Sequence, residues 1–257
     1  MKQARSLLVS LIALSLLLIG VLPTFSEKLP SRCLISSVPY VKQLTNYCGP
    51  ATLTTVLKYW QADANQESVG EEVYDSSIKA TNGADMMLYA RKRGFSAYSW
   101  NSSLADLKEK LALGIPVIVL QDTSVMDRSG HYRVVTGYDE TAGVVYVSDP
   151  YEPDKKQIDY NTFLTLWQRH GNWSLLVCPA NRDVFKQDLD EKNPVVHIDL
   201  AYIYYKRGDN KAAEKESRLA LALEPQNYSA QMLLSKAISA AGTHSEADKS
   251  DGKQKRR

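Results

Sequence analysis

The segment GHYRVVTGYDETAGVVYVSDP, residues 130–150, contains two runs of β-branched and aromatic residues separated by a polar turn with a glycine. Two such runs, here 132–138 and 144–148, predict a pair of neighbouring strands. In an antiparallel pair, the start of the first strand lies beside the end of the second. We therefore expect His131 and Asp149 to lie within hydrogen-bonding distance of each other.

The elements around this hairpin predict the fold class. Apolar residues at helical spacing precede the hairpin, whereas short apolar runs flank it. Helices followed by a sheet indicate an α+β domain. The expected helices cover 51–60, 83–93, 104–113 and 160–169, and the further strands cover 38–41, 115–121 and 173–178.

A cysteine stands where the first of these helices begins. Cys48 precedes Gly49 and Pro50, and proline is favoured in the first turn of a helix. Free N–H groups and the helix dipole stabilise negative charge there, which lowers the pKa of a thiol from about 8.5. Gln43, in the preceding loop, can direct its amide at the oxygen of a tetrahedral intermediate, with the Cys48 N–H as second donor. Taken alone, a buried structural cysteine is the more common explanation.

His131 and Asp149 complete a possible catalytic triad. Each alone has an ordinary explanation, a surface histidine or a turn aspartate. The order Cys, His, Asp, with each residue at the edge of its predicted element, indicates nucleophilic catalysis by a thiol. In this interpretation Cys48 is the nucleophile, His131 the general base and acid, and Asp149 the residue that orients the imidazole.

Three segments carry a family resemblance. Residues 43–50, 130–139 and 145–150 resemble the bacteriocin-processing peptidases, papain-like cysteine peptidases that cut leader peptides after double glycine, and their stand-alone exported relatives. The resemblance implies a papain-like cysteine peptidase domain over 34–180. It also implies the same roles for the nucleophile, the base, the orienting carboxylate and the oxyanion donor.

The sequence departs from the transporter-linked members of that family, because no membrane bundle or nucleotide-binding domain follows the peptidase segment. This leaves the double-glycine specificity open. Peptide hydrolysis, acyl transfer by the same triad, and a catalytically idle scaffold that binds a protein partner are the three alternatives. Tyr47, Trp100 and Trp173 are candidates for lining a substrate cleft.

The first residues predict export. Lys2 and Arg5 precede an almost unbroken apolar run at 7–22, and small residues follow it up to Ser26. This pattern is typical of a signal peptide over 1–26, either cleaved after Ser26 or retained as an N-terminal membrane anchor. We expect an exported protein, periplasmic or membrane-anchored and facing outside the cytoplasm.

A second, all-α unit is expected after a charged linker at 181–193. Residues 194–241 carry the small and aromatic side chains of a tetratricopeptide repeat, and residues 242–257 form a basic tail expected to be disordered. A single repeat leaves an apolar face uncovered, so the unit should dock on the peptidase domain or bind a protein partner. An ordinary helical hairpin is the alternative. The matching positions are Leu200, Ala201, Tyr204, Gly208, Ala213, Ala220 and Pro225.

Charge and cysteine content exclude other classes. The net charge of +2 over 257 residues gives no indication of a nucleic-acid partner. Cysteines with the paired spacing of a zinc site are lacking, and His170 and His197 lie in helical segments without ligands at metal-binding spacing, so we expect no metal or cofactor. With Cys48 free, Cys33 and Cys178 are the two cysteines left to pair, and a disulfide or two free thiols are both open.

Overall fold

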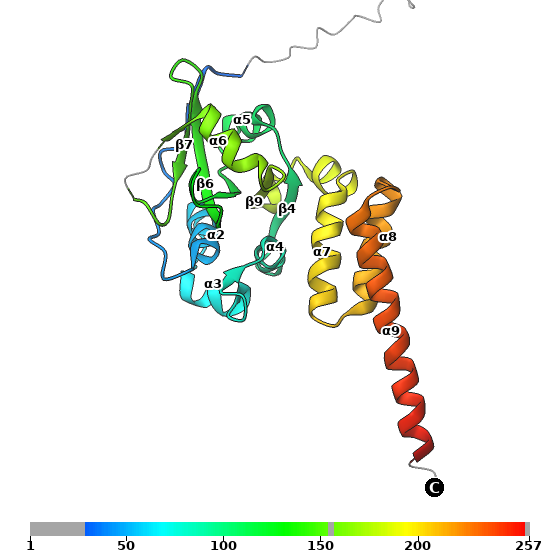
Figure 1. Ribbon diagram of the computed structural model, residues 1–257. Helices are drawn as coiled ribbons and strands as arrows, with labels where there is room; N and C mark the ends of the chain where they lie inside the picture. Colours follow the sequence, from blue (N-terminus) through cyan, green and yellow to red (C-terminus); the bar gives the residue numbers. More distant parts are fainter. Residues whose placement is uncertain (1–28, 154–156, 255–257) are drawn as a thin grey trace, which may run out of the picture.

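The computed structural model describes residues 29–153 and 157–254, so the expected signal segment at 1–26 lies outside the described residues. An antiparallel sheet with strand order β4-β9-β5-β6-β7-β8 forms the centre of the fold, and β1 pairs with β6 (Figure 1). The predicted hairpin is β6 and β7, which are adjacent and antiparallel. The strands are β1 (Arg32–Leu34), β4 (Phe95–Asn101), β5 (Val117–Asp122), β6 (Gly130–Asp139), β7 (Val144–Ser148), β8 (Gln157–Asp159) and β9 (Trp173–Pro179).

Among the described residues before β9, four helices pack on this sheet, and a fifth, α3, packs on α2 and α4. One of them, α2, contacts β6, and α4 contacts β4 and β9, whereas α5 and α6 contact the β5–β7 region. A two-stranded ladder of β2 (Tyr74–Asp75) and β3 (Ala80–Thr81) lies between α3 and α4. The mixture of helices and an antiparallel sheet confirms the expected α+β class. The helices are α2 (Cys48–Tyr59), α3 (Gln66–Val73), α4 (Gly83–Lys92), α5 (Leu104–Ala112) and α6 (Tyr160–Gln168).

The first strand differs from the expectation. The predicted strand at 38–41 is wrong, because this segment has no strand hydrogen bonding, and β1 forms earlier in the chain instead. Pro39 lies within the predicted strand and has no N–H to donate to a ladder. The sequence prediction also missed α3, β4, β8 and the short ladder of β2 and β3. The other predicted helices and strands are present, with ends shifted by no more than a few residues.

The segment at 181–193 is not a free linker. Phe185 and Leu189 are buried in the main apolar core, and the Asn193 side-chain amide donates to the carbonyl oxygen of Ser99 in β4 at 2.7 Å. The segment contains two short helical turns, η2 (Ala180–Arg182) and η3 (Gln187–Glu191). The apolar residues of this charged segment therefore pack into the core, and the segment connects the sheet to the helices that follow.

Three helices end the chain, α7 (Pro194–Lys206), α8 (Asn210–Leu223) and α9 (Tyr228–Gln254). They lie side by side, and α7 faces α4 and β4 (Figure 1). Val196 and Leu200 of α7 join the main core, and Arg207 pairs with Asp85 of α4 at 2.6 Å. The helical unit therefore docks on the sheet domain, while its assignment as a tetratricopeptide repeat stays a prediction.

The end of the chain also differs from the expectation. Disorder was expected from residue 242, but α9 continues to Gln254. No proline interrupts this stretch, so nothing in its backbone forces the helix to end. Among residues 29–153 and 157–254, no helix is both long and apolar enough to cross a membrane.

Candidate active site

The N-terminus of α2 is open to a negative charge. The helix begins at Cys48, its N-cap Tyr47 makes no side-chain cap, and its first turn contains no acidic residue. Backbone N–H groups of Gly49 and Tyr132 hydrogen-bond to the Cys48 sulfur. A Cβ on Gly49 would lie 2.6 Å from the Thr81 Cβ, so glycine is what lets the start of the helix approach β3 this closely. Backbone N–H donors from α2 and from β6 therefore surround the Cys48 sulfur.

The predicted bond between His131 and Asp149 is present. His131 Nε2 donates to Asp149 Oδ1 at 2.8 Å, and both side chains are buried. The register of the hairpin, in which Val134 pairs with Ser148, places these residues together at one end of the two strands. His131 also hydrogen-bonds to Cys48. Because Nε2 is engaged by Asp149, Nδ1 is the nitrogen left to face the sulfur.

The electrostatics of the pair favour an ion pair. Burial raises the pKa of the Cys48 thiol, but the hydrogen bond and charge of His131 outweigh it and lower that pKa below its ordinary value. Burial lowers the pKa of His131, but hydrogen bonds to Asp149 and Cys48 outweigh it and raise that pKa. Opposite shifts on neighbouring groups are the arrangement that activates a thiol nucleophile.

A residue that the sequence analysis missed holds the carboxylate. Arg133 is fully buried, and its Nε donates to Asp149 Oδ2 at 2.7 Å. Burial raises the pKa of Asp149, but the hydrogen bond and charge of His131 and the charge of Arg133 hold it well below its usual range. The backbone N–H of Tyr151 also donates to Oδ1 at 2.9 Å. The carboxylate is therefore fixed in position and ionised.

The same arginine ties the site to the end of β5. Its terminal nitrogens donate to Gln121 Oε1 at 3.3 Å and to the carbonyl oxygens of Asp122 and Thr123 at 3.1 and 2.8 Å. Every donor of a buried guanidinium needs an acceptor, and carbonyl groups at a strand end supply them. The signal available in the sequence was a lone arginine, Arg133, inside the otherwise apolar strand that follows His131.

Gln43 lies in the same cavity as Cys48 and His131, which has a volume of about 530 Å³. Its backbone N–H donates to the carbonyl oxygen of Pro150 at 3.0 Å, which fixes the loop beside the end of the hairpin. Gln66 of α3 holds the loop on either side of Gln43, because its amide bonds to Leu44 N at 2.9 Å and to Lys42 O at 2.8 Å. The Gln43 amide oxygen is buried without a hydrogen-bond partner.

The comparison with protein families matches the Peptidase_C39 like family over residues 35–175. The chain belongs to this family. The match covers the helix with Cys48, the hairpin with His131 and the turn with Asp149, so these side chains lie within the C39-like region of the chain. No curated protein matches.

Three of the solved structures similar to this C39-like chain bear the names of peptidases. A C39-like peptidase from Bacillus anthracis has 16% identity and a TM-score of 0.49, covering 57% of this chain and 97% of that one. The peptidase domain of Streptococcus ComA, a bi-functional ABC transporter of a quorum-sensing pathway, has 23% identity and a TM-score of 0.46, covering 55% and 98%. A double glycine motif protease from an AMS/PCAT transporter, in complex with the leader peptide, has 22% identity and a TM-score of 0.46, covering 56% and 92%.

His170 and His197 each lie against a carboxylate that the spacing along the sequence did not reveal. His170 Nε2 lies 2.8 Å from Asp122 Oδ1, and His197 Nδ1 lies 2.7 Å from Glu216 Oε2. Both partners are distant in the sequence, which is why helical spacing did not reveal them. Within the described part of the chain, no group of three or more potential ligands could hold a metal ion.

The other two cysteines of this C39-like protein are free thiols, so the disulfide that was left open is not formed. Cys33 in β1 donates to the carbonyl oxygen of Leu111 at 3.3 Å, which turns its sulfur toward α5. Cys178 is buried in β9, opposite Ser96 of β4, and burial raises its pKa to about 12. Each sulfur therefore has its own surroundings, and neither resembles those of Cys48.

The three aromatic residues that were candidates for lining a substrate cleft lie in different surroundings. Tyr47 packs on Tyr74 with ring centroids 4.8 Å apart, and Trp100 is buried with its indole N–H donating to Asp106. Trp173 lines a hollow close to the catalytic cavity. It is the candidate with a position suited to contact with a substrate.

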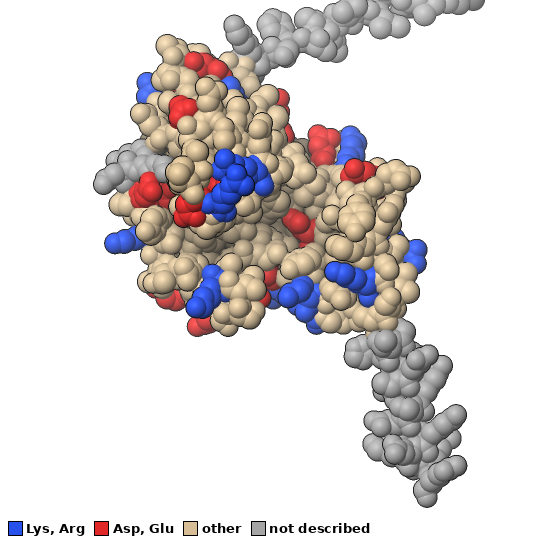
Figure 2. All heavy atoms as spheres, viewed as in Figure 1, with Lys and Arg blue, Asp and Glu red and all other residues tan. Residues whose placement is uncertain are grey.

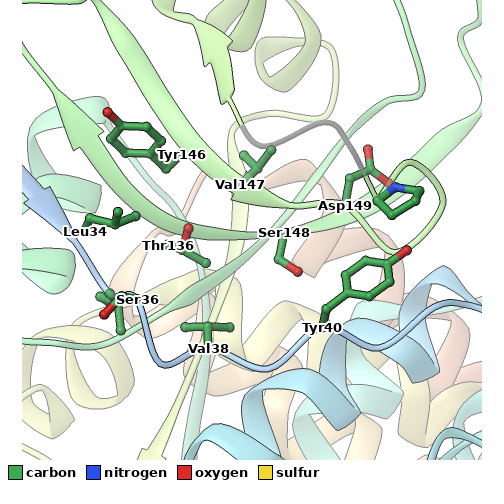
Figure 3. Close-up of a pocket in the computed structure, with 11 residues that line it drawn as sticks. Leu34, Ser36, Val38, Tyr40, Thr136, Tyr146, Val147, Ser148 and Asp149 are labelled. Carbon is green, nitrogen blue, oxygen red and sulfur yellow. The ribbon is translucent and has the colours of Figure 1, made fainter.

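A second cavity lies on another side of Asp149 and has a volume of about 630 Å³. Its walls come from the segment after β1 and from β6 and β7, with Val38, Thr136 and Val147 around it (Figure 3). The lining is mostly apolar, and the Asp149 oxygens are already bonded to His131 and Arg133. Chemistry at the thiol therefore belongs to the first cavity.

Proposed function

We propose that this protein is an exported cysteine peptidase that hydrolyses peptide bonds. The observation that carries the proposal is a single chain of hydrogen bonds, in which Cys48 at the uncapped start of α2 bonds to His131, and His131 bonds to Asp149 at 2.8 Å. Membership of the C39-like peptidase family supports the same chemistry.

In the first half of the reaction, the Cys48 thiolate attacks the carbonyl carbon of the substrate. The Gln43 side-chain amide and the Cys48 N–H then stabilise the oxyanion of the tetrahedral intermediate. His131 gives its proton to the amine leaving group as the C–N bond breaks, which leaves a thioester on Cys48.

In the second half, His131 takes a proton from water, and the resulting hydroxide attacks the thioester. The C–S bond breaks, the acid product leaves, and the thiolate and the protonated imidazole are restored. Asp149 keeps the imidazole in the tautomer that faces Cys48 and stabilises its charged form. Arg133 keeps Asp149 ionised and in place.

The substrate of the proposed reaction is a peptide or an unfolded segment of a protein. The resemblance to double-glycine leader peptidases makes a leader peptide one candidate. The helices α7–α9 are proposed as a tetratricopeptide unit that takes a protein partner. Export rests on the charged and apolar pattern of residues 1–26, and a reporter fusion active only outside the cytoplasm tests it.

The test of the catalytic proposal is labelling of the purified protein with an epoxide-type inhibitor of cysteine peptidases. We expect one adduct, at Cys48, and none in the Cys48→Ala variant. Loss of cleavage of a peptide mixture in the same variant would complete the result. If the folded wild-type protein forms no adduct and cleaves no peptide, the catalytic proposal fails. The chain is then better explained as a catalytically idle scaffold that binds a protein partner.

A further inference from the structure

The helical unit brings an acidic side chain to the edge of the catalytic cleft. Asp199 of α7 lines a hollow with a volume of about 310 Å³. Three residues, Thr81, Leu120 and Tyr132, line both this hollow and the cavity that contains Cys48. Figure 2 shows acidic side chains at the junction between the globular body and the helical unit. The hollow beside α7 therefore adjoins the cavity that contains Cys48.

Asp199 differs from the other buried carboxylates of this region, because no cationic side chain of the described residues forms an ion pair with it. Asp149 and Asp122 are each bonded to an arginine at 2.7 Å, and Asp85 is bonded to Arg207 at 2.6 Å. Asp199 accepts a hydrogen bond from the Trp173 indole N–H at 3.0 Å. Burial raises its pKa, and hydrogen bonds from Trp173 and Ser99 oppose this.

A partly buried carboxylate without a cation is unfavourable in a folded protein unless it has a function or a ligand. The bond to Trp173 alone does not require a charge, because an amide or a hydroxyl oxygen would accept it equally well. The docking of α7 therefore does not explain why this position holds a carboxyl group and not an amide or a hydroxyl group.

The walls of the hollow suit a long basic side chain. The Trp173 ring stands edge-on to Tyr132 with centroids 5.8 Å apart, and both rings line the hollow. A Cβ on Gly83 would lie 2.2 Å from the Trp173 ring, so glycine at the start of α4 lets the indole occupy this place. Aromatic walls pack against the methylene groups of lysine or arginine, while a carboxylate binds the charged end.

We propose that this hollow is a substrate subsite, in which Asp199 binds a lysine or arginine side chain of the peptide that is cut at Cys48. This inference rests on the proposed peptidase function and deepens it. It makes α7 a wall of the substrate cleft, so that the helical unit selects the sequence that is cut. His170 borders the same hollow, with its Nε2 already bonded to Asp122.

The experiment uses the full-length protein and a peptide mixture made by cleavage of a proteome after glutamate, which keeps internal lysine and arginine. Mass spectrometry of the products gives the residues on either side of each new cut. We expect lysine and arginine to be enriched at one fixed position near the cut. For the best such peptide, replacing that basic residue by glutamine should lower kcat/KM about 10-fold or more, as expected for loss of a charged hydrogen bond.

The matched variant is Asp199→Asn, which keeps an acceptor for Trp173 and removes the charge. It should lower kcat/KM for the basic peptide about 10-fold and change that for the glutamine peptide by less than about threefold. If Asp199→Asn does not fold, the lack of any preference between the two peptides in the wild-type protein would still overturn the subsite.

The outcomes are distinguishable. Cleavage without a preferred basic residue, or an unchanged preference in a folded Asp199→Asn protein, would overturn the subsite and leave the peptidase function intact. If the wild-type protein cuts nothing and Cys48 does not label, the peptidase function fails, and the subsite fails with it.

Discussion

One histidine–aspartate pair lies on each side of Arg133. The hydrogen bonds within the two pairs have the same length. His131 Nε2 and Asp149 Oδ1 are 2.8 Å apart, as are His170 Nε2 and Asp122 Oδ1. Each carboxylate also binds an arginine at 2.7 Å. The pair at His131 is 7% and 1% exposed, whereas the pair at His170 is 22% and 3% exposed.

The difference between the pairs is the third member. His131 hydrogen-bonds to a cysteine at the start of a helix, whereas His170 follows the end of α6 and borders the hollow beside α7. An oriented imidazole is therefore not in itself a sign of catalysis in this protein. In the proposed mechanism, the thiol at the N-terminus of α2 distinguishes a catalytic pair from a structural one, and variants of the two pairs test this distinction.

The largest effect is expected from the catalytic histidine. His131→Ala should lower peptide turnover by about 10⁴-fold or more, because base, acid and thiolate activation are lost together. Asp122→Asn instead removes the charge from the pair with His170. In this variant, the rate of Cys48 alkylation should stay within about threefold of the wild-type rate, because the two sites share no reacting atom. Rates of iodoacetamide labelling and peptide turnover measure both. Equal losses in the two variants would remove the distinction between the pairs.

A smaller loss is expected at the orienting carboxylate. The turnover rate that remains in Asp149→Ala should be about 10- to 100-fold higher than the rate that remains in His131→Ala. It should also destabilise the fold by about 3–5 kcal/mol, because Arg133 is then buried without its anionic partner. Asp149→Asn, which keeps an acceptor for the imidazole, is the matched control and should retain more turnover. Thermal unfolding and steady-state kinetics separate the two effects. An Asp149→Ala protein with wild-type turnover would contradict the assigned role.

The oxyanion donor should come next. Gln43→Ala should lower kcat by about 10²–10³-fold, because one donor to the tetrahedral intermediate is lost. Alkylation of Cys48 forms no oxyanion, so its rate should stay unchanged in the same variant. Unchanged turnover would refute the oxyanion role, and a change in both rates would show that the loop positions the thiol instead.

The pH dependence should show the smallest but most specific effect. The lowered pKa of Cys48 and the raised pKa of His131 both shift the pair toward its thiolate–imidazolium form. Because that form is the reactive one in the proposed mechanism, protonation of the thiolate at low pH and loss of the imidazolium proton at high pH should give a bell-shaped kcat/KM profile with macroscopic pKa values. His131→Ala should move the onset of Cys48 alkylation to higher pH. An onset that does not move would show that His131 is not coupled to the thiol.

The sequence predicted those parts of the site that depend on local pattern. The hairpin at 130–150 follows from two β-branched runs and a turn, and antiparallel pairing alone then places His131 beside Asp149. Cys48 follows from a helix pattern with proline in its first turn. In each case the decisive contact lies within one element or between two neighbouring ones.

The parts that failed depend on contacts across the fold. Strand pairing at 38–41 was wrong because the edge of β6 is taken by β1 and Pro39 lacks a donor. The segment at 181–193 reads as a polar linker, but two of its side chains are buried in the core. Arg133 was missed because its acceptors come from the end of β5 and the turn after β7, which no local pattern places together.

The proposed mechanism requires that Cys48 be the one activated thiol among the three cysteines of the chain, whose labelling rates can be compared directly. Iodoacetamide labelling of the native protein at about pH 6.5, followed by peptide mass mapping, gives the rate at each sulfur. Burial raises the pKa of Cys33, and that of Cys178 to about 12, whereas that of Cys48 is lowered. The account predicts that Cys48 labels about 100-fold faster than the other two, since the thiolate is the reacting form. Equal rates at all three cysteines would contradict it.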